Sequence, residues 1–139
     1  MLPAVNCVIQ DIDLKVSNFL DQYSAYRTLE SQAADSQESN PELAATLRGG
    51  RAQPEAGMQR AMARLAELRD QVIEMLDTLV TEGEALVVEH GEGSPEHEAH
   101  ERRYQDYLRA GEAVQAAVDR VLLLWEARDQ PDAASAQGQ

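Results

Sequence analysis

The chain has 139 residues, 43% of them hydrophobic but only 4% aromatic, and a formal net charge of −13 from 25 acidic against 12 basic residues. This length is enough for one hydrophobic core, so we expect a single domain over residues 1–130. The acidic balance argues against direct binding to nucleic acid or to an anionic membrane, because both need a cationic surface.

Composition also favours a soluble helical protein. Ala, Glu, Gln, Leu and Arg, which dominate the sequence, are good helix formers. The single cysteine, Cys7, permits no disulfide within the chain, which favours a cytoplasmic location. The first fifteen residues lack the basic start of a signal peptide, and every apolar run is shorter than the ~18 residues of a membrane span.

The first predicted helix covers residues 5–32. Its apolar side chains recur in steps of three and four, which is the period of an amphipathic helix. They are Val5, Ile9, Ile12, Val16, Phe19, Tyr23 and Tyr26. From Ser31 the sequence SQAADSQESN is polar and has no period, so we expect a loop there.

A short helix is predicted over residues 41–48, inside the first connection. Asn40 has the position of an N-cap, Pro41 that of a first helical residue, and Gly49 that of a stop. The short helix therefore interrupts the loop before the second long helix.

The second long helix is predicted over residues 54–90. Its core positions are Met58, Met62, Leu65, Leu68, Val72, Met75, Leu76, Leu79 and Leu86. Gly83 costs about 1 kcal/mol relative to Ala in a helix interior, so we expect fraying or a kink there.

The third long helix is predicted over residues 95–129, with Ser94 as its N-cap and Pro95 as its first residue. Its apolar side chains occupy more than one stripe, because three consecutive leucines cannot all face one core. We expect the surplus to form a self-association face in a homodimer. The residues of this face are Leu123, Leu124 and Trp125.

Together these elements predict an all-α fold. Long helices joined by short connections favour an elongated antiparallel three-helix bundle, up-down-up, with the short extra helix in the first connection. Residues 131–139 are small and polar and are predicted to be a disordered C-terminal tail.

All three histidines lie within residues 89–103, among glutamates. His97 and His100 have a spacing that suits two metal ligands on one helix face, and His90 could reach across a turn. The Glu-x-x-His and His-Glu-x-x-His patterns are absent. We interpret the stretch as a turn between two helices, and keep a metal site at these histidines as the alternative.

No motif indicates an enzyme or a cofactor. The glycines form no phosphate-binding loop, and no nucleophile is paired with a base in the sequence. Arg48, Arg51, Arg60 and Arg64 form the one basic cluster. It could bind an anion, but we interpret these arginines as partners of acids such as Glu42, Glu55 and Glu67.

Glutamates gather near one end of the predicted rod and concentrate negative potential there. Charge of this kind speeds encounter with a basic partner, and tyrosine adds apolar area with a polar tip. The predicted partner-binding residues are Glu84, Glu89, Glu92, Glu96, Glu98, Glu101, Tyr104 and Tyr107.

The leading hypothesis is a non-enzymatic acidic helical protein that inhibits, neutralises or escorts a basic or apolar partner protein. In size, acidity and helicity the chain is similar to many bacterial secretion chaperones, toxin antidotes and phage-encoded inhibitors, a similarity that implies no particular residue. The alternatives are a self-associating structural component, a metal-binding protein that uses residues 90–101, and a nucleic-acid mimic that occupies a partner's basic groove.

Overall fold

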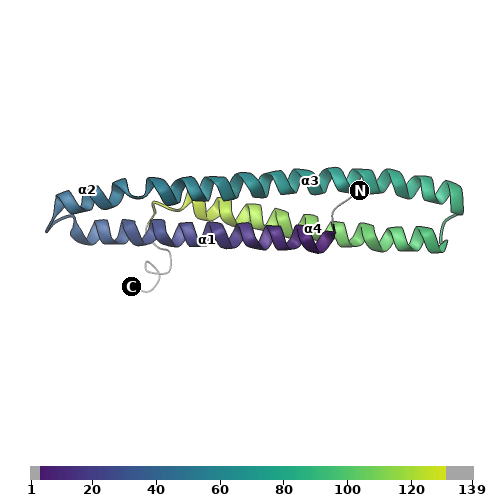
Figure 1. Cartoon of the computed structure of the whole chain (residues 1–139), viewed down its shortest axis with the longest axis horizontal. Coiled ribbons are helices and arrows are strands. Elements are labelled where there is room, and N and C mark those ends of the chain that lie inside the picture. The colour runs from purple at the N-terminus through teal and green to yellow at the C-terminus, as the bar shows by residue number, and fades with distance from the viewer. Residues whose placement is uncertain (1–3, 131–139) are drawn as a thin grey trace.

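Four helices account for most of residues 4–130, which are the residues that the computed structural model describes. They are α1 (Val5–Ser36), α2 (Pro41–Gly49), α3 (Ala52–His90) and α4 (Pro95–Glu126). The long helices run up, down and up along one axis, and α2 lies in the first connection (Figure 1). The predicted all-α three-helix bundle with a short extra helix is confirmed. The predicted tail, residues 131–139, lies outside the described residues.

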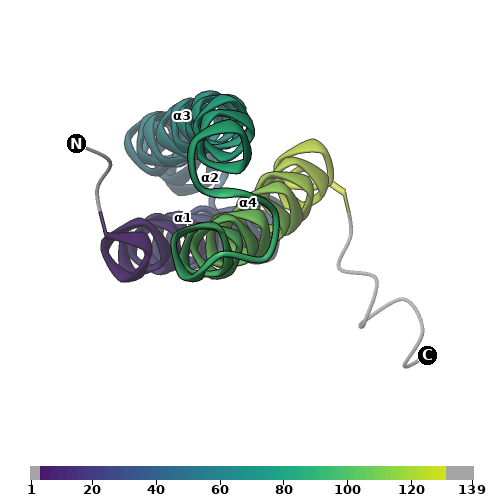
Figure 2. The ribbon, with the colours of Figure 1, turned by 90° about the vertical axis from the view of Figure 1, so that its right-hand side faces the viewer.

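The core follows the predicted apolar stripes. Viewed along the axis, α1, α3 and α4 stand at the corners of a triangle, and their stripes meet inside it (Figure 2). The largest fully buried side chains are Phe19, Tyr26, Met58, Leu65, Val72, Leu79, Val114 and Val121. Burial of these side chains is the main favourable contribution to folding, because each removes a large apolar area from water.

The two predicted helix caps are confirmed. The Asn40 side chain accepts a hydrogen bond from the Leu43 backbone N–H at 3.1 Å. Ser94 Oγ accepts one from the His97 backbone N–H at 3.2 Å. Each cap satisfies a backbone donor at a helix start, so these residues set where α2 and α4 begin.

α1 continues to Ser36, beyond its predicted end at residue 32, and the connection to α2 is only residues 37–40. The prediction of a loop from Ser31 onward was therefore wrong. Ala33 is 0% exposed, Ala44 of α2 is also buried, and α1 and α2 are in contact. Small side chains allow two helices to pack closely. Because the buried residues here are alanines, the sequence shows no stripe of large apolar residues that would have predicted the last turns of α1.

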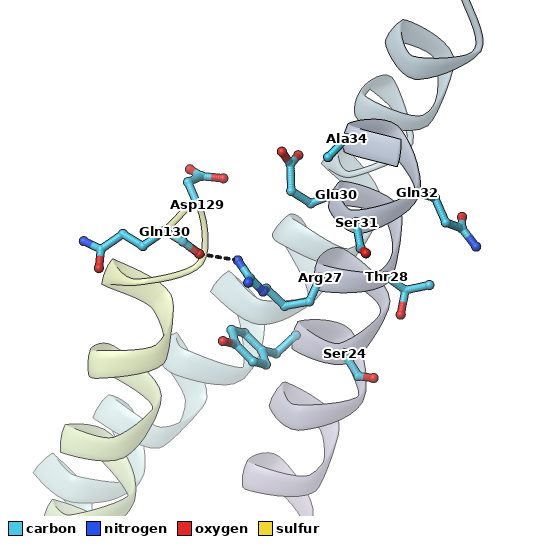
Figure 3. Close-up of a pocket in the computed structure, with 10 residues that line it drawn as sticks. Ser24, Arg27, Thr28, Glu30, Ser31, Gln32, Ala34, Asp129 and Gln130 are labelled. Carbon is cyan, nitrogen blue, oxygen red and sulfur yellow. Dashed lines mark hydrogen bonds between the residues drawn. The ribbon is translucent and has the colours of Figure 1, made fainter. Parts of the chain in front are cut away.

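Polar side chains join the end of α4 to α1. Arg27 donates a hydrogen bond to the backbone oxygen of Gln130 at 2.7 Å (Figure 3). It donates another to the backbone oxygen of Arg128, also at 2.7 Å. The buried Tyr26 hydroxyl donates to the Asp129 carboxylate. α4 itself ends at Glu126, before the predicted residue 129, and these contacts hold the short segment that follows it against α1.

Arginines of the predicted basic cluster pair with acids. Arg51 lies 2.6 Å from Glu30, and Arg64 lies 3.0 Å from Asp11 and 3.2 Å from Glu67. The Asp11 hydrogen bond, above all, raises the pKa of the Arg64 guanidinium. Ion pairing is thus confirmed at Arg64 with the predicted Glu67. Arg51 also pairs with an acid, but that acid is Glu30 and not Glu42 or Glu55.

The long helices are staggered. The start of α1 lies beside the middle of α3, where Cys7 and Val8 share a groove with Val72 and Met75. Beyond that point α3 and α4 continue together without α1 (Figure 1). We call this part of α3 and α4, residues 76–107, the hairpin end. No helix within residues 4–130 is long and apolar enough to cross a membrane.

Candidate functional site

The histidine-containing stretch is built around a tight turn at the tip of the hairpin end. α3 ends at His90, α4 begins at Pro95, and Gly91 and Gly93 between them have φ angles of 90° and 81°. Residues with a Cβ rarely adopt these angles, so the two glycines suit the reversal. The interpretation of this stretch as a turn is confirmed, with its flanks belonging to the two helices.

The predicted glutamates all lie on the surface of the hairpin end. The exposed residues are Glu84, Glu89, Glu92, Glu96, Glu98 and Glu101. Residues 70–101 hold ten of the chain's 25 acids and neither a lysine nor an arginine. The hairpin end itself, residues 76–107, holds nine acids and two bases, Arg102 and Arg103, so it carries a large share of the negative charge of the molecule.

Histidine side chains lie within 4 Å of three glutamates at the hairpin end. The distances are 3.5 Å from His97 Nε2 to Glu101, 3.8 Å from His90 Nε2 to Glu89, and 3.8 Å from His100 Nε2 to Glu82. Each of these pairs is an ion pair only when the histidine is protonated. The glutamates thus keep most of their negative potential available to a partner.

His100 is the one buried polar side chain among the described residues, with 8% of its surface exposed. Its ring packs on Gly83 of α3: a Cβ at that position would lie 3.0 Å from His100 Cε1. Neither ring nitrogen has a hydrogen-bond partner. α3 continues as one helix from Ala52 through Gly83 to His90, and Gly83 packs closely against His100.

The three histidines have separate surroundings. His90 is exposed at the end of α3, His97 Nδ1 accepts a hydrogen bond from the Gly93 backbone N–H at 3.2 Å, and His100 is buried against Gly83. Within residues 4–130, no three His, Cys, Asp or Glu side chains gather as metal ligands do. The geometry therefore offers the metal-binding alternative no support.

An open groove of about 390 Å³ lies on the surface of the hairpin end, between α3 and α4. Its apolar walls include Leu79, Val80, Val87 and Tyr104, and its acidic ones Glu84 and Glu101. Tyr104 is therefore beside the acids, as predicted. Tyr107 is only 2% exposed, so it packs inside the bundle and does not present its side chain to a partner.

The three predicted self-association residues lie in different surroundings. Leu123 is 68% exposed on α4. Leu124 and Trp125 are partly buried against the core, and the Arg128 guanidinium lies 3.7 Å over the Trp125 ring. One exposed leucine therefore remains of the predicted apolar face.

A second hollow, of about 790 Å³, lies between the C-terminal part of α1 and the segment that follows α4. Its wall is polar and includes Arg27, Glu30 and Gln130 (Figure 3). Arg27 is already engaged with the backbone after α4. This hollow thus has neither an apolar floor nor a free charge that would indicate a ligand, and we assign it no role.

The groove and the Gly83 contact were missed in the sequence. A glycine in a helix interior often marks a close approach of another element, and that signal was present at Gly83. The groove had no comparable signal, because its walls come from two segments whose relative rotation depends on the packing of α3 against α4.

No protein-family model, no curated protein and no solved structure matches this chain. The functional interpretation of the hairpin end therefore rests on the geometry and charge of the chain itself.

Proposed function

We propose that the chain is a non-enzymatic protein-binding protein whose acidic hairpin end docks on a basic partner protein and thereby inhibits, neutralises or escorts it. The observation that carries the proposal is the charge of residues 70–101, which hold ten acids and no lysine or arginine. A surface with one sign of charge attracts the opposite sign and rejects its own, so it filters partners during encounter.

Apolar surface beside the acids supports the same proposal. Charge steers association, but affinity comes mainly from a few desolvated apolar or aromatic anchors. Val80 is exposed and Tyr104 is half-buried in the groove of the hairpin end. The apolar anchor residues and the acidic residues therefore lie on the same surface of the hairpin end.

A cytoplasmic location is part of this proposal. Cys7 is a free, exposed cysteine with no disulfide partner. Free surface thiols are typical of reducing compartments.

The test is affinity purification of the tagged protein from its source cells at low and at raised salt, with mass spectrometry of the retained proteins. We expect one stoichiometric partner with a basic surface, released as ionic strength rises because salt screens exposed charges. The variant Glu92→Lys/Glu96→Lys/Glu98→Lys should retain at least tenfold less of it.

Two controls complete this test. The variant Glu38→Lys/Glu42→Lys/Glu126→Lys makes the same change of net charge away from the hairpin end, at exposed positions, and should retain the partner. Light scattering addresses the self-association alternative: a concentration-dependent homodimer with no other bound protein would contradict the proposal.

A further inference from the structure

A long groove follows α3 and α4 on the side of the hairpin that faces away from α1. It consists of two separate hollows between the same helices, the 390 Å³ groove of the hairpin end and a second one of about 520 Å³, which follow each other along the same helix faces. On α3 its wall runs through Arg69, Ile73, Leu76, Val80, Glu84 and Val87. On α4 it runs through His97, Glu101, Tyr104, Leu108, Glu112 and Gln115.

Both walls have steps of three and four residues, so each is one face of its helix. The residues of α3 that line the groove with α1 are in a different row, which includes Arg64, Leu68, Gln71 and Met75. The long groove therefore lies beside α3 and α4 where a fourth helix of a bundle would pack. From residue 69 to residue 87 its length is about 27 Å, which equals about 18 helical residues.

The floor of the long groove is apolar and accessible. Ile73 is 50% exposed and Val80 is 45% exposed, although both belong to a helix whose other face is fully packed. Leu76, Leu108 and Gly111 also line this part of the groove, and a Cβ at Gly111 would contact Val72 and Leu76 of α3. A contiguous exposed apolar stripe on a helix pair is the type of surface that an amphipathic helix covers.

Acidic side chains lie on both walls of the long groove and predominate on α4. Glu84 on α3 and Glu101, Glu112 and Asp119 on α4 line it, and Arg69, the one base among its lining residues, pairs with Asp70 at 3.5 Å. A second copy of this chain, with its net charge of −13, would place acidic helices against these walls. Charge complementarity favours a basic occupant instead.

His100 adds a second indication that the long groove receives a ligand. It lines the groove, it is more than nine-tenths buried, and both ring nitrogens lack a hydrogen-bond partner. A buried polar group without a hydrogen-bond partner destabilises the folded state. Both nitrogens are covered by neighbouring atoms, so a docked helix would supply the missing partner by turning the ring toward the groove.

We propose that the long groove binds an amphipathic α-helix of a partner protein, with its apolar face on Ile73 and Val80 and with lysines or arginines along both flanks. This inference rests on the proposed function and specifies the partner's recognition element. The docked helix completes a four-helix arrangement along α3 and α4.

The probe is a synthetic 18-residue peptide of leucine, lysine and alanine whose leucines recur in steps of three and four. A peptide of the same composition with dispersed leucines is the charge-matched control. The protein variants are Ile73→Glu in the groove and Leu14→Glu on α1; these side chains are 50% and 53% exposed. Both variants add one negative charge, so a difference between them isolates the groove.

Fluorescence anisotropy should show that Ile73→Glu weakens binding of the amphipathic peptide at least tenfold and that Leu14→Glu changes it less than twofold. The dispersed peptide should bind at least tenfold more weakly. Equal binding of the two peptides, equal effects of the two variants, or no binding of the amphipathic peptide would each overturn the inference. Circular dichroism verifies folding, and Ile73→Ala replaces Ile73→Glu if the latter is unfolded.

Two further results separate this inference from the proposed function. If a basic protein from the source cells is retained equally by the unaltered chain and by Ile73→Glu, the groove inference fails and the proposed function stands. If sedimentation shows a homodimer that Ile73→Glu dissociates, a second copy occupies the groove and the basic helix is excluded.

Discussion

Gly83 of α3 packs directly on the His100 ring of α4, and a single methyl group tests this contact. In the Gly83→Ala variant the new Cβ would lie 3.0 Å from His100 Cε1 and 3.2 Å from Nδ1. Overpacking costs about 1–3 kcal/mol, which exceeds the roughly 1 kcal/mol gained from the better helix former. We therefore expect Gly83→Ala to lower the free energy of unfolding by about 1 kcal/mol in urea denaturation.

The control is the Gly83→Ala substitution in a variant that lacks the His100 imidazole ring. In a His100→Ala background, Gly83→Ala should raise the free energy of unfolding, because only its helix preference remains. Gly49→Ala, at a position with no neighbour within 4 Å, should also be neutral or stabilising. If Gly83→Ala had the same sign in both backgrounds, the close contact would not limit the packing of α3 on α4.

The buried hydroxyl of Tyr26, at the end of the bundle away from the hairpin end, should make the free energy of unfolding depend on pH. Burial, followed by the hydrogen bond to Asp129, raises the pKa of its hydroxyl above the ordinary value of 10.0. The folded state therefore holds this proton more tightly than the unfolded state. The resulting stability is fully present below pH 10.0 and is lost as pH rises through the folded-state pKa.

Urea denaturation between pH 8 and 11 tests this expectation. The free energy of unfolding of the unaltered chain should fall more steeply above about pH 10 than that of Tyr26→Phe, which has no proton to lose at this position. Tyr23→Phe, on the same helix, keeps the Tyr26 hydroxyl and should follow the unaltered chain. Parallel curves for the unaltered chain and Tyr26→Phe would refute a raised pKa at Tyr26.

At the scale of single elements, α1 and α2 meet through alanines, and neighbouring alanines give a matched test. Ala33 is 0% exposed, whereas Ala34 is exposed on the same turn of α1. Ala33→Leu should lower the free energy of unfolding by about 1–3 kcal/mol because the larger side chain has no space against α2. Ala34→Leu should change it by less than about 0.5 kcal/mol. Equal effects in chemical denaturation would mean that α2 does not pack on Ala33.

These alanines also show where sequence reasoning succeeded and where it failed. Phe19, Met58 and Val114 were predictable, because large apolar side chains at helical spacing identify the buried face of each helix. The caps at Asn40 and Ser94 were predictable because they depend on local geometry alone. The last turn of α1 was not, since alanine is common on exposed and buried helix faces alike.

At the scale of the whole molecule, charge is divided unequally along the rod. Ten of the 25 acids lie in residues 70–101, and the remaining fifteen share the molecule with all 12 lysines and arginines. The position of Glu84 and Glu101 near one end followed from the sequence. Their place on the two sides of one groove did not, because the rotation of α3 against α4 is a property of the packed bundle.

The stagger of α1 has a consequence for hydrogen exchange. Beyond Met75 each helix packs on one neighbour instead of two, so local opening exposes less apolar surface there than in the middle of the bundle. Backbone amides of residues 76–107 should therefore exchange with deuterium faster than those near Phe19 and Leu65. A bound helical peptide should slow that exchange, which would report occupation of the groove without any mutation.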